Sequence, residues 1–140
     1  MNIEECINYL LTQAQNKVNV LFRENLKIHE VTPAQYMLLY HLWAEDGLSP
    51  TYLATLTGLD ASTITGLLTR MESKKLIKRK HSKNDRRAIH VYLTPQGAGL
   101  EDDITKVIEQ SNIETLSVLS ETEQSEFKDY LNRICDNAKS

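Results

Sequence analysis

Side chains that can bind phosphate are concentrated in the segment 59–94. Between Arg70 and His90, nine Lys or Arg residues stand against two acids, so this stretch carries a net charge of +7 in a chain whose net charge is −3. The net charge of all the other residues is therefore −10. A basic patch attracts polyanions while an acidic remainder repels them. This division of charge predicts a nucleic-acid-binding surface in the segment.

A helix with one small, polar face is predicted next to these cations. Ile64, Leu67, Leu68 and Met71 recur at the spacing of one helix face, and we expect this helix to begin at residue 60 or 61. The opposite face carries hydroxyls, a glycine and one arginine, which fit the DNA major groove and can bond to phosphates or base edges. A Thr-rich, solvent-exposed face is the alternative, but Thr is a mediocre helix former. The DNA contacts expected from this helix are Ser62, Thr63, Thr65, Gly66, Thr69 and Arg70.

A two-stranded hairpin is predicted to follow this helix. Ile89, Val91 and Leu93 alternate with polar residues, which indicates a half-buried strand, and residues 77–81 can pair with it antiparallel. The connecting sequence Ser-Lys-Asn-Asp-Arg-Arg suits a turn. Its two arginines suit the minor groove of DNA, because the negative potential of a narrow minor groove attracts inserted arginine side chains. We expect Asp85 to hold one guanidinium group in a bidentate pair, and an ordinary charged turn is the alternative. The DNA contacts expected from the hairpin are Lys80, Lys83, Asp85, Arg86 and Arg87.

The helices before this segment are indicated by apolar spacing and capping signals. A long amphipathic helix of about 25 residues is expected from Ile3. The Thr-Pro-Ala-Gln sequence at 32–35 is a capping box with proline in the first turn, so a second helix is predicted over residues 33–45. Because this second helix is apolar nearly all round, we expect it to be buried between two layers.

A helix-turn-helix is predicted between this second helix and the hairpin. Ser-Pro at 49–50 begins a short third helix, with Leu53 and Leu56 expected to face inward. Gly58 then permits a tight turn into the polar-faced helix. A helix-turn-helix followed by a hairpin is a winged helix, so the fold class expected is mainly α with a small β-hairpin wing.

Two more helices are predicted after the hairpin. Thr-Pro at 94–95 begins a helix expected to reach about Leu119, and the capping box at 120–123 begins the last one. The first and last helices carry apolar stripes that little else in one chain can cover. A second copy related by a twofold axis is therefore expected.

Composition places the chain among ordinary globular proteins. It has 140 residues, 41% of them hydrophobic and 25% charged, which fits one domain with a real core. No apolar run approaches the roughly 20 residues of a membrane span, and the first residues carry acids where a secretory signal carries cations. We therefore expect a cytoplasmic protein, with Cys6 and Cys135 as thiols and not as a disulfide.

Five short motifs together resemble the MarR family of bacterial winged-helix transcription regulators. The family pattern includes Ser-x-x-Thr in the recognition helix, Leu-x-x-Arg-Leu-Glu, Gly-Leu-x-x-Arg, Asp-Arg-Arg and Leu-Thr-x-x-Gly. The matching residues here are Ser62 and Thr65; Leu67, Arg70, Met71 and Glu72; Leu76 and Arg79; Asp85, Arg86 and Arg87; and Leu93, Thr94 and Gly97. The similarity also includes residues 31–43 and the order of the flanking helices, so it covers essentially the whole chain.

The resemblance implies a homodimer that presents two winged helices to a pseudo-palindromic operator. Residues 1–31 and 95–140 would form the dimerisation helices, and residues 32–94 the DNA-binding winged helix-turn-helix. We expect a repressor. Three departures from the family pattern stand out. Lys75 stands where glycine is usual, and Gly66 where arginine is frequent. Against the peroxide-sensing branch, Cys6 lies about two residues from the position of the reactive cysteine, and Pro33 stands where a tyrosine partner is expected.

In this family an effector pocket lies between the dimer helices and the winged helix. Tyr36, Tyr40, His41 and Trp43 on the second predicted helix are the candidates here, offering aromatic faces with polar tips to a phenol or another aromatic acid. The alternative is that these four side chains are simply core.

Two other regulatory roles stay open from the sequence. Cys6 lies near the position of the reactive cysteine in the peroxide-sensing branch of the family, so a thiol redox sensor is one alternative. A winged helix that binds protein without DNA is the other. The four histidines have no metal-site spacing, and no catalytic constellation is present, so no metal, no cofactor and no enzyme activity are expected.

Overall fold

The computed structural model describes residues 1–82, 84–85 and 87–138. Its elements are η1 (Ile3–Glu5), α1 (Ile7–Leu26), η2 (Lys27–His29), α2 (Pro33–Ala44), α3 (Pro50–Thr57), α4 (Ala61–Ser73), β1 (Ile77–His81), β2 (Ile89–Leu93), α5 (Pro95–Gly99), α6 (Glu101–Leu116) and α7 (Glu121–Asn137). This mainly helical chain with one antiparallel hairpin confirms the fold class expected from the sequence.

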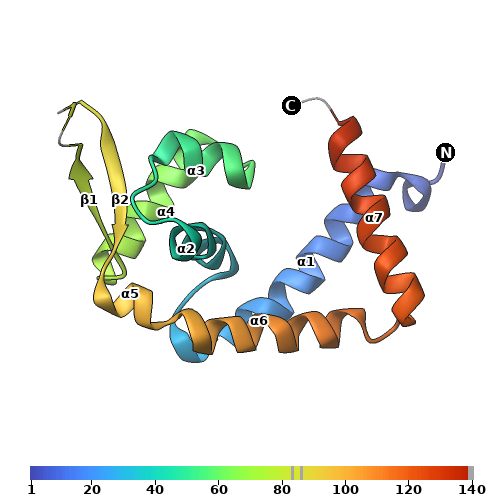
Figure 1. The fold of residues 1–140 in the computed structure, drawn as a ribbon. Coiled ribbons are helices and arrows are strands. Elements are labelled where there is room, and N and C mark those ends of the chain that lie inside the picture. The colour runs from blue at the N-terminus through green and yellow to red at the C-terminus, as the bar shows by residue number, and fades with distance from the viewer. Residues whose placement is uncertain (83, 86, 139–140) are drawn as a thin grey trace.

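The elements form two groups joined by α6. Figure 1 shows α2, α3, α4 and the hairpin together at one end, where they make the winged helix. Helix α6 runs beneath them to the other end, where α1 and α7 stand with both chain termini. Within the hairpin, β1 pairs with β2 from Ile77 opposite Leu93 to His81 opposite Ile89.

The predicted capping signals start the helices as expected. Thr32 and Gln35 form the reciprocal capping box of α2, with bonds of 3.1 and 3.2 Å. Ser49 caps α3, and Asp60 caps α4 by accepting the backbone N–H of Thr63 at 2.7 Å. These caps satisfy backbone donors that a helix leaves free in its first turn.

The helix expected from Pro95 to Leu119 is in fact two helices. Helix α5 ends at Gly99, and Leu100 separates it from α6. Glycine is a poor helix former, and this short helix contains Gly97 and Gly99. At Gly97 a Cβ would collide with the carbonyl oxygen of Leu76, so only glycine permits this close approach of the two backbones.

Three smaller expectations were also wrong. The first helix is interrupted at Cys6, whose extended backbone separates η1 from α1. Leu56 does not face inward, since it is 39% exposed while Leu53 is fully buried. Helix α2 is not buried all round, because Met37 and Tyr40 are 37% and 54% exposed.

The core lies mainly within the winged helix. Helix α2 is at its centre, with Leu38, Leu39 and Leu42 almost fully buried. The predicted stripe of α4 and the inward residues of the hairpin pack against them, and Ile104 of α6 extends the same core toward α1. None of the helices in the described part of the chain is long and apolar enough to cross a membrane.

Candidate nucleic-acid interface

Helix α4 has one buried face and one exposed polar face. Its four stripe residues are at most 4% exposed, as the sequence spacing predicted. Ser62, Thr63, Thr65, Thr69 and Arg70 are exposed on the other side, and Gly66 is half-buried. The structure therefore brings the predicted contact residues of this helix onto one solvent-facing surface, where short side chains leave its profile low.

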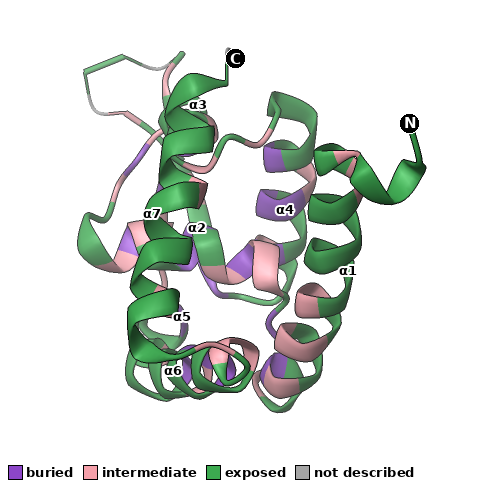
Figure 2. Ribbon diagram, turned by 90° about the vertical axis from the view of Figure 1, so that its right-hand side faces the viewer, coloured by how far each residue is buried: buried purple, intermediate pink, exposed green. Residues whose placement is uncertain are grey.

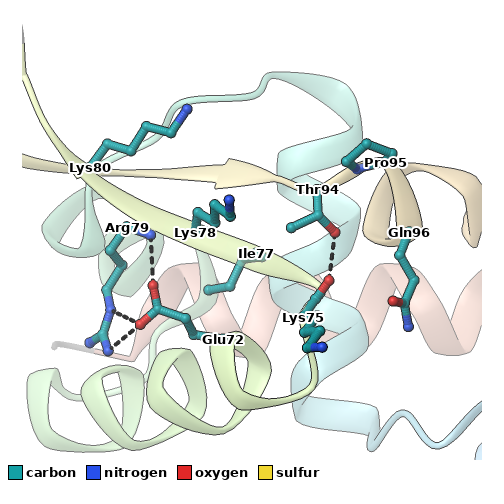
Figure 3. Close-up of a pocket in the computed structure, with 9 residues that line it drawn as sticks. All are labelled: Glu72, Lys75, Ile77, Lys78, Arg79, Lys80, Thr94, Pro95 and Gln96. Carbon is teal, nitrogen blue, oxygen red and sulfur yellow. Dashed lines mark hydrogen bonds and ion pairs between the residues drawn. The ribbon is translucent and has the colours of Figure 1, made fainter.

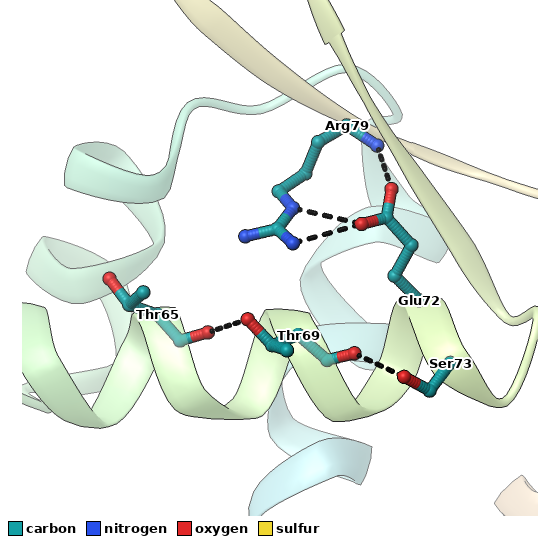
Figure 4. Close-up of polar contacts among 5 residues, drawn as sticks. All are labelled: Thr65, Thr69, Glu72, Ser73 and Arg79. Carbon is teal, nitrogen blue, oxygen red and sulfur yellow. Dashed lines mark hydrogen bonds and ion pairs between the residues drawn. The ribbon is translucent and has the colours of Figure 1, made fainter.

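The hydroxyls of this surface donate to the helix backbone. Thr65 donates to the carbonyl of Ala61 at 2.9 Å. Thr69 donates to the carbonyl of Thr65 at 2.9 Å, and Ser73 to that of Thr69 at 3.1 Å (Figure 4). Each oxygen keeps its lone pairs free to accept. In this arrangement the hydroxyl oxygens can accept hydrogen bonds from the amino groups of adenine or cytosine. A hydroxyl can donate to a phosphate only if its O–H first rotates away from the backbone carbonyl.

Arg70 lies over the one position of α4 that lacks a side chain. A Cβ on Gly66 would stand 3.4 Å from Nη1 of Arg70. Sequence comparison with the family pattern marked Gly66 as the loss of an arginine. The structure adds that this glycine leaves room for the guanidinium group of the next turn.

Glu72 and Arg79 fasten the hairpin to α4. The Arg79 guanidinium donates to Oε1 of Glu72 from Nη2 at 2.9 Å and from Nε at 3.2 Å, and the backbone N–H of Arg79 donates to Oε2 at 3.1 Å (Figure 4). The hydrogen bonds from the side chain and backbone of Arg79 hold the pKa of Glu72 below its usual value. Arg79, counted among the cations of the basic segment, thus has a structural partner that its sequence position did not reveal.

A basic groove lies beside the end of α4. It has a volume of about 640 Å³ and is bounded by the end of α4, β1 and the beginning of α5 (Figure 3). Lys78 and Lys80 extend from β1 on the side away from Glu72. Lys80 also lies 5.4 Å from the centre of the Tyr92 ring. The groove is lined by Glu72, Lys75, Ile77, Lys78, Arg79, Lys80, Thr94, Pro95 and Gln96, so it holds four cations and one acid.

At the tip of the hairpin, two of the predicted contacts, Lys83 and Arg86, lie outside the described residues. Asp85 and Arg87 are both exposed. The Asp85 carboxylate accepts the backbone N–H of Arg87 at 2.9 Å, so Asp85 shapes the turn. The salt bridges among the described residues do not include a pair between Asp85 and the Arg87 guanidinium, and a pair with Arg86 lies outside the described residues.

Three of the four proposed effector residues line a cavity on α2. Tyr36, Tyr40 and His41 border a space of about 200 Å³ between α2 and the end of α3. Burial, followed by the neighbouring Tyr40, raises the pKa of Tyr36, so its phenol keeps its proton. Trp43 does not line this cavity, because its indole N–H donates to the carbonyl of Gly97 at 2.9 Å and ties α2 to α5.

A second cavity of about 270 Å³ lies on the other side of Tyr36, between α1 and α2. The family resemblance implied a pocket between the dimerisation helices and the winged helix, but none of the α1 residues that line this cavity was among the candidates. Its polar groups are the amides of Gln15 and Asn19 and the Tyr36 phenol, and it has no charged side chain. The cavity is lined by Gln15, Val18, Asn19, Phe22, Pro33, Ala34, Tyr36 and Met37.

The two cysteines are free thiols in the structure. Cys6 is half-buried and precedes the first turn of α1, while Cys135 is exposed on α7. No contact in the described part of the chain places a cation on the Cys6 sulfur.

A winged helix with an exposed polar recognition helix and a basic hairpin defines a class of DNA-binding proteins. Comparison with known proteins narrows this class. The model of the MarR family matches residues 31–89. Together with the relatives below, this match supports a MarR-family winged-helix regulator, and that family is one of transcriptional regulators and not of enzymes.

Individual relatives agree with this assignment. The transcriptional regulator MgrA of Staphylococcus aureus is 28% identical over 134 residues, which are 95% of this chain and 90% of MgrA. The regulator TtmR of Methylorubrum extorquens is 38% identical over 80 residues, 57% of this chain but only 41% of TtmR. The structure of BpsR of Bordetella bronchiseptica, whose DNA binding is regulated by 6-hydroxynicotinic acid, superposes with a TM-score of 0.89 at 27% identity, covering 99% of both chains.

Proposed function

We propose that this MarR-family regulator is a repressor that binds a pseudo-palindromic DNA operator as a homodimer in the cytoplasm. The observation that carries the proposal is the exposed face of α4, which is small, polar and flanked by a basic groove. Such a face fits the major groove, and the cations beside it fit the phosphates. Two such helices in a dimer would lie about one DNA turn, roughly 34 Å, apart.

The division of contacts follows from the side chains. Arg70 is the residue on α4 able to bind guanine by two hydrogen bonds, while Ser62, Thr63, Thr65 and Thr69 offer hydroxyls beside Gly66. Lys80 and Arg87 would hold the phosphates or the minor groove, together with Lys83 and Arg86, which lie outside the described residues.

The dimer is supported by apolar surface at the end of the molecule that holds α1 and α7. No residue of α7 is buried in the single chain (Figure 2). Phe127, Tyr130 and Ile134 are 43%, 50% and 46% exposed on one side of this helix. The beginning of the chain exposes a second such set, Ile3, Ile7, Leu10 and Leu11. A twofold partner would cover both sets, so residues 1–31 and 95–140 are the proposed dimerisation helices.

A small aromatic effector is proposed for the cavities on either side of Tyr36. The ring of Tyr36 and the amides of Gln15 and Asn19 suit an aromatic molecule that carries hydroxyl or amide groups. The cavity between α1 and α2 has no cation, so the single chain favours a phenol over a carboxylate there. The regulation of BpsR by 6-hydroxynicotinic acid supports a small aromatic effector, although that molecule carries the carboxylate for which this cavity offers no cation.

Selection of DNA by the purified protein tests this function. Random duplexes are bound to the protein through several rounds and then sequenced, and the bound genomic fragments are footprinted. We expect a sequence with twofold symmetry whose half-sites are one helical turn apart. Recovery of no common sequence, with equal binding to every duplex, would contradict an operator-binding regulator and favour a winged helix that binds protein.

A further inference from the structure

The elbow between α1 and α2 connects the proposed dimerisation helices to the winged helix. It consists of η2 and residues 30–32, and Figure 1 shows it beneath α2. Glu30 closes η2 with φ of 56° and ψ of 33°, a left-handed conformation that costs energy for a residue with a side chain. Lys75, just after α4, has φ of 62°. Strained backbone therefore occurs at this elbow and at the end of the recognition helix.

Lys74 connects the elbow to the end of α4 by hydrogen bonds. Lys74 is the C-cap residue of α4, and its ammonium group donates to the carbonyl of Glu30 at 2.6 Å and to Oε1 of Gln35 at 3.0 Å. Lys74 therefore points away from the exposed face of α4, although it belongs to the basic segment. Lys74 is an exposed residue, but its ammonium group bonds to the elbow and to α2.

Gln35 is the buried hydrogen-bond partner of Lys74. It is only 1% exposed, and its Oε1 also accepts the backbone N–H of Thr32 at 3.2 Å in the capping box of α2. The same oxygen therefore orders the start of α2 and holds the end of α4. Beside it lies a cavity of about 700 Å³, lined by residues of α1, the elbow and Lys74, so apolar packing does not fill this side of the elbow.

We propose that Lys74 is a positioning residue that fixes the recognition helix relative to the dimerisation helices. With Lys74 bonded to Glu30 and Gln35, the end of α4 cannot shift without moving the elbow. In a dimer this contact sets the distance and angle between the two recognition helices, and so the half-site spacing that the protein accepts. The inference rests on the proposed dimeric function, which it deepens.

The DNA part of the test compares half-site spacings. Operators selected by the wild-type protein are prepared unchanged and with one base pair inserted between the half-sites, which turns and separates them. Lys74→Met removes the ammonium but keeps an apolar stem. We expect its preference for the unchanged operator over the spaced one to fall about fivefold. Lys74→Arg, which keeps the positive charge and N–H donors, should retain the wild-type preference.

Lys78→Met is the matched control, since it removes one positive charge from exposed β1. It should weaken binding to both operators equally and keep the wild-type preference. If Lys74→Met likewise weakens both operators equally, or lowers the melting temperature with the preference unchanged, Lys74 is a phosphate contact or a purely stabilising residue, and the proposal is overturned.

Amide hydrogen exchange without DNA tests the contact separately from the proposed function. In Lys74→Met the amides of residues 30–35 should exchange faster than in the wild type, and in Lys78→Met they should not change. This result supports the contact even if the wild-type protein selects no operator, in which case the proposed function alone fails. Unchanged exchange in Lys74→Met overturns the contact whatever the DNA results.

Discussion

Arg70 and Gly66 act together at the scale of single residues. The guanidinium group reaches across the glycine on the exposed face of α4, where it meets no larger side chain. A bidentate contact from arginine to guanine contributes both affinity and base preference. Arg70 is therefore the residue from which the strongest sequence discrimination is expected.

The substitution Arg70→Ala should weaken operator binding by about 1–3 kcal/mol and relax the preference at one base pair of each half-site. Fluorescence anisotropy with the selected operator and its single-base variants measures both effects. An equal loss on every duplex would mean that Arg70 contacts only phosphate.

Lys75 occupies a conformation that suits glycine. Its φ of 62° is left-handed, and the carbonyl of Lys75 accepts the Thr94 hydroxyl at 2.6 Å, which holds the turn between α4 and β1. Lys75→Gly should stabilise the protein by about 0.5–1 kcal/mol, because relief of this strain exceeds the added entropy of the unfolded chain. Urea unfolding measures the change. Lys78→Gly, within β1, should instead destabilise, and a loss of stability in both variants would rule out strain at Lys75.

At the scale of elements, the position of the hairpin depends on the pair between Glu72 of α4 and Arg79 of β1. Both side chains are partly exposed, at 38% and 29%, so solvent screens the pair and its contribution is modest. The pair nevertheless links β1 directly to α4, because three hydrogen bonds converge on one carboxylate.

Glu72→Gln should lower the free energy of unfolding by roughly 0.5–1 kcal/mol at neutral pH. The pKa of Glu72 is below its ordinary value of 4.5 in the folded state. Its contribution is therefore present above pH 4.5 and disappears as the pH falls through the folded pKa. Unfolding measured from pH 7 to 3 should show the two proteins converging in acid, and a constant difference at every pH would contradict this role.

The sequence predicted the elements whose signals are local. Helix starts at Thr32, Ser49 and Asp60 follow from caps a few residues long, and the buried stripe of α4 follows from its spacing. The break at Leu100 had a local signal in the two glycines of α5, whereas the close approach of Gly97 to Leu76, distant in sequence, had none.

The partners of several candidate residues were also beyond local patterns. Trp43 was expected in the effector pocket but bonds to Gly97, 54 residues away, and Lys74 bonds to Gln35, 39 residues away. Such contacts are decided by how the elements pack. The exposed face of α4 was predicted correctly because a helix with one buried stripe has only one opposite side.

At the scale of the whole molecule, the two ends of the single chain differ in how much apolar surface they bury. The winged helix has its own core, whereas α7 buries none of its residues and the first turns of α1 expose apolar side chains. Burying these surfaces in a twofold interface would stabilise the end of the molecule that holds both termini. It would also set the distance between the two recognition helices.

Tyr130→Glu should therefore disrupt the dimer, since it places a charge at the centre of the exposed apolar side of α7. Sedimentation equilibrium at micromolar concentration should give a dimer for the wild type and a reduced mass for this variant. Asn132→Glu, elsewhere on the same helix, adds the same charge and should remain dimeric. Equal masses for both variants would place the dimer interface elsewhere.

The central claim is that the polar face of α4 and the basic segment beside it bind DNA. The most direct test is the salt dependence of operator affinity, because neutralised phosphates release counterions in proportion to their number. For a dimer with six to ten phosphate contacts, we expect affinity to fall by about 10³–10⁵ between roughly 50 and 200 mM salt. An affinity that is independent of salt would contradict the account.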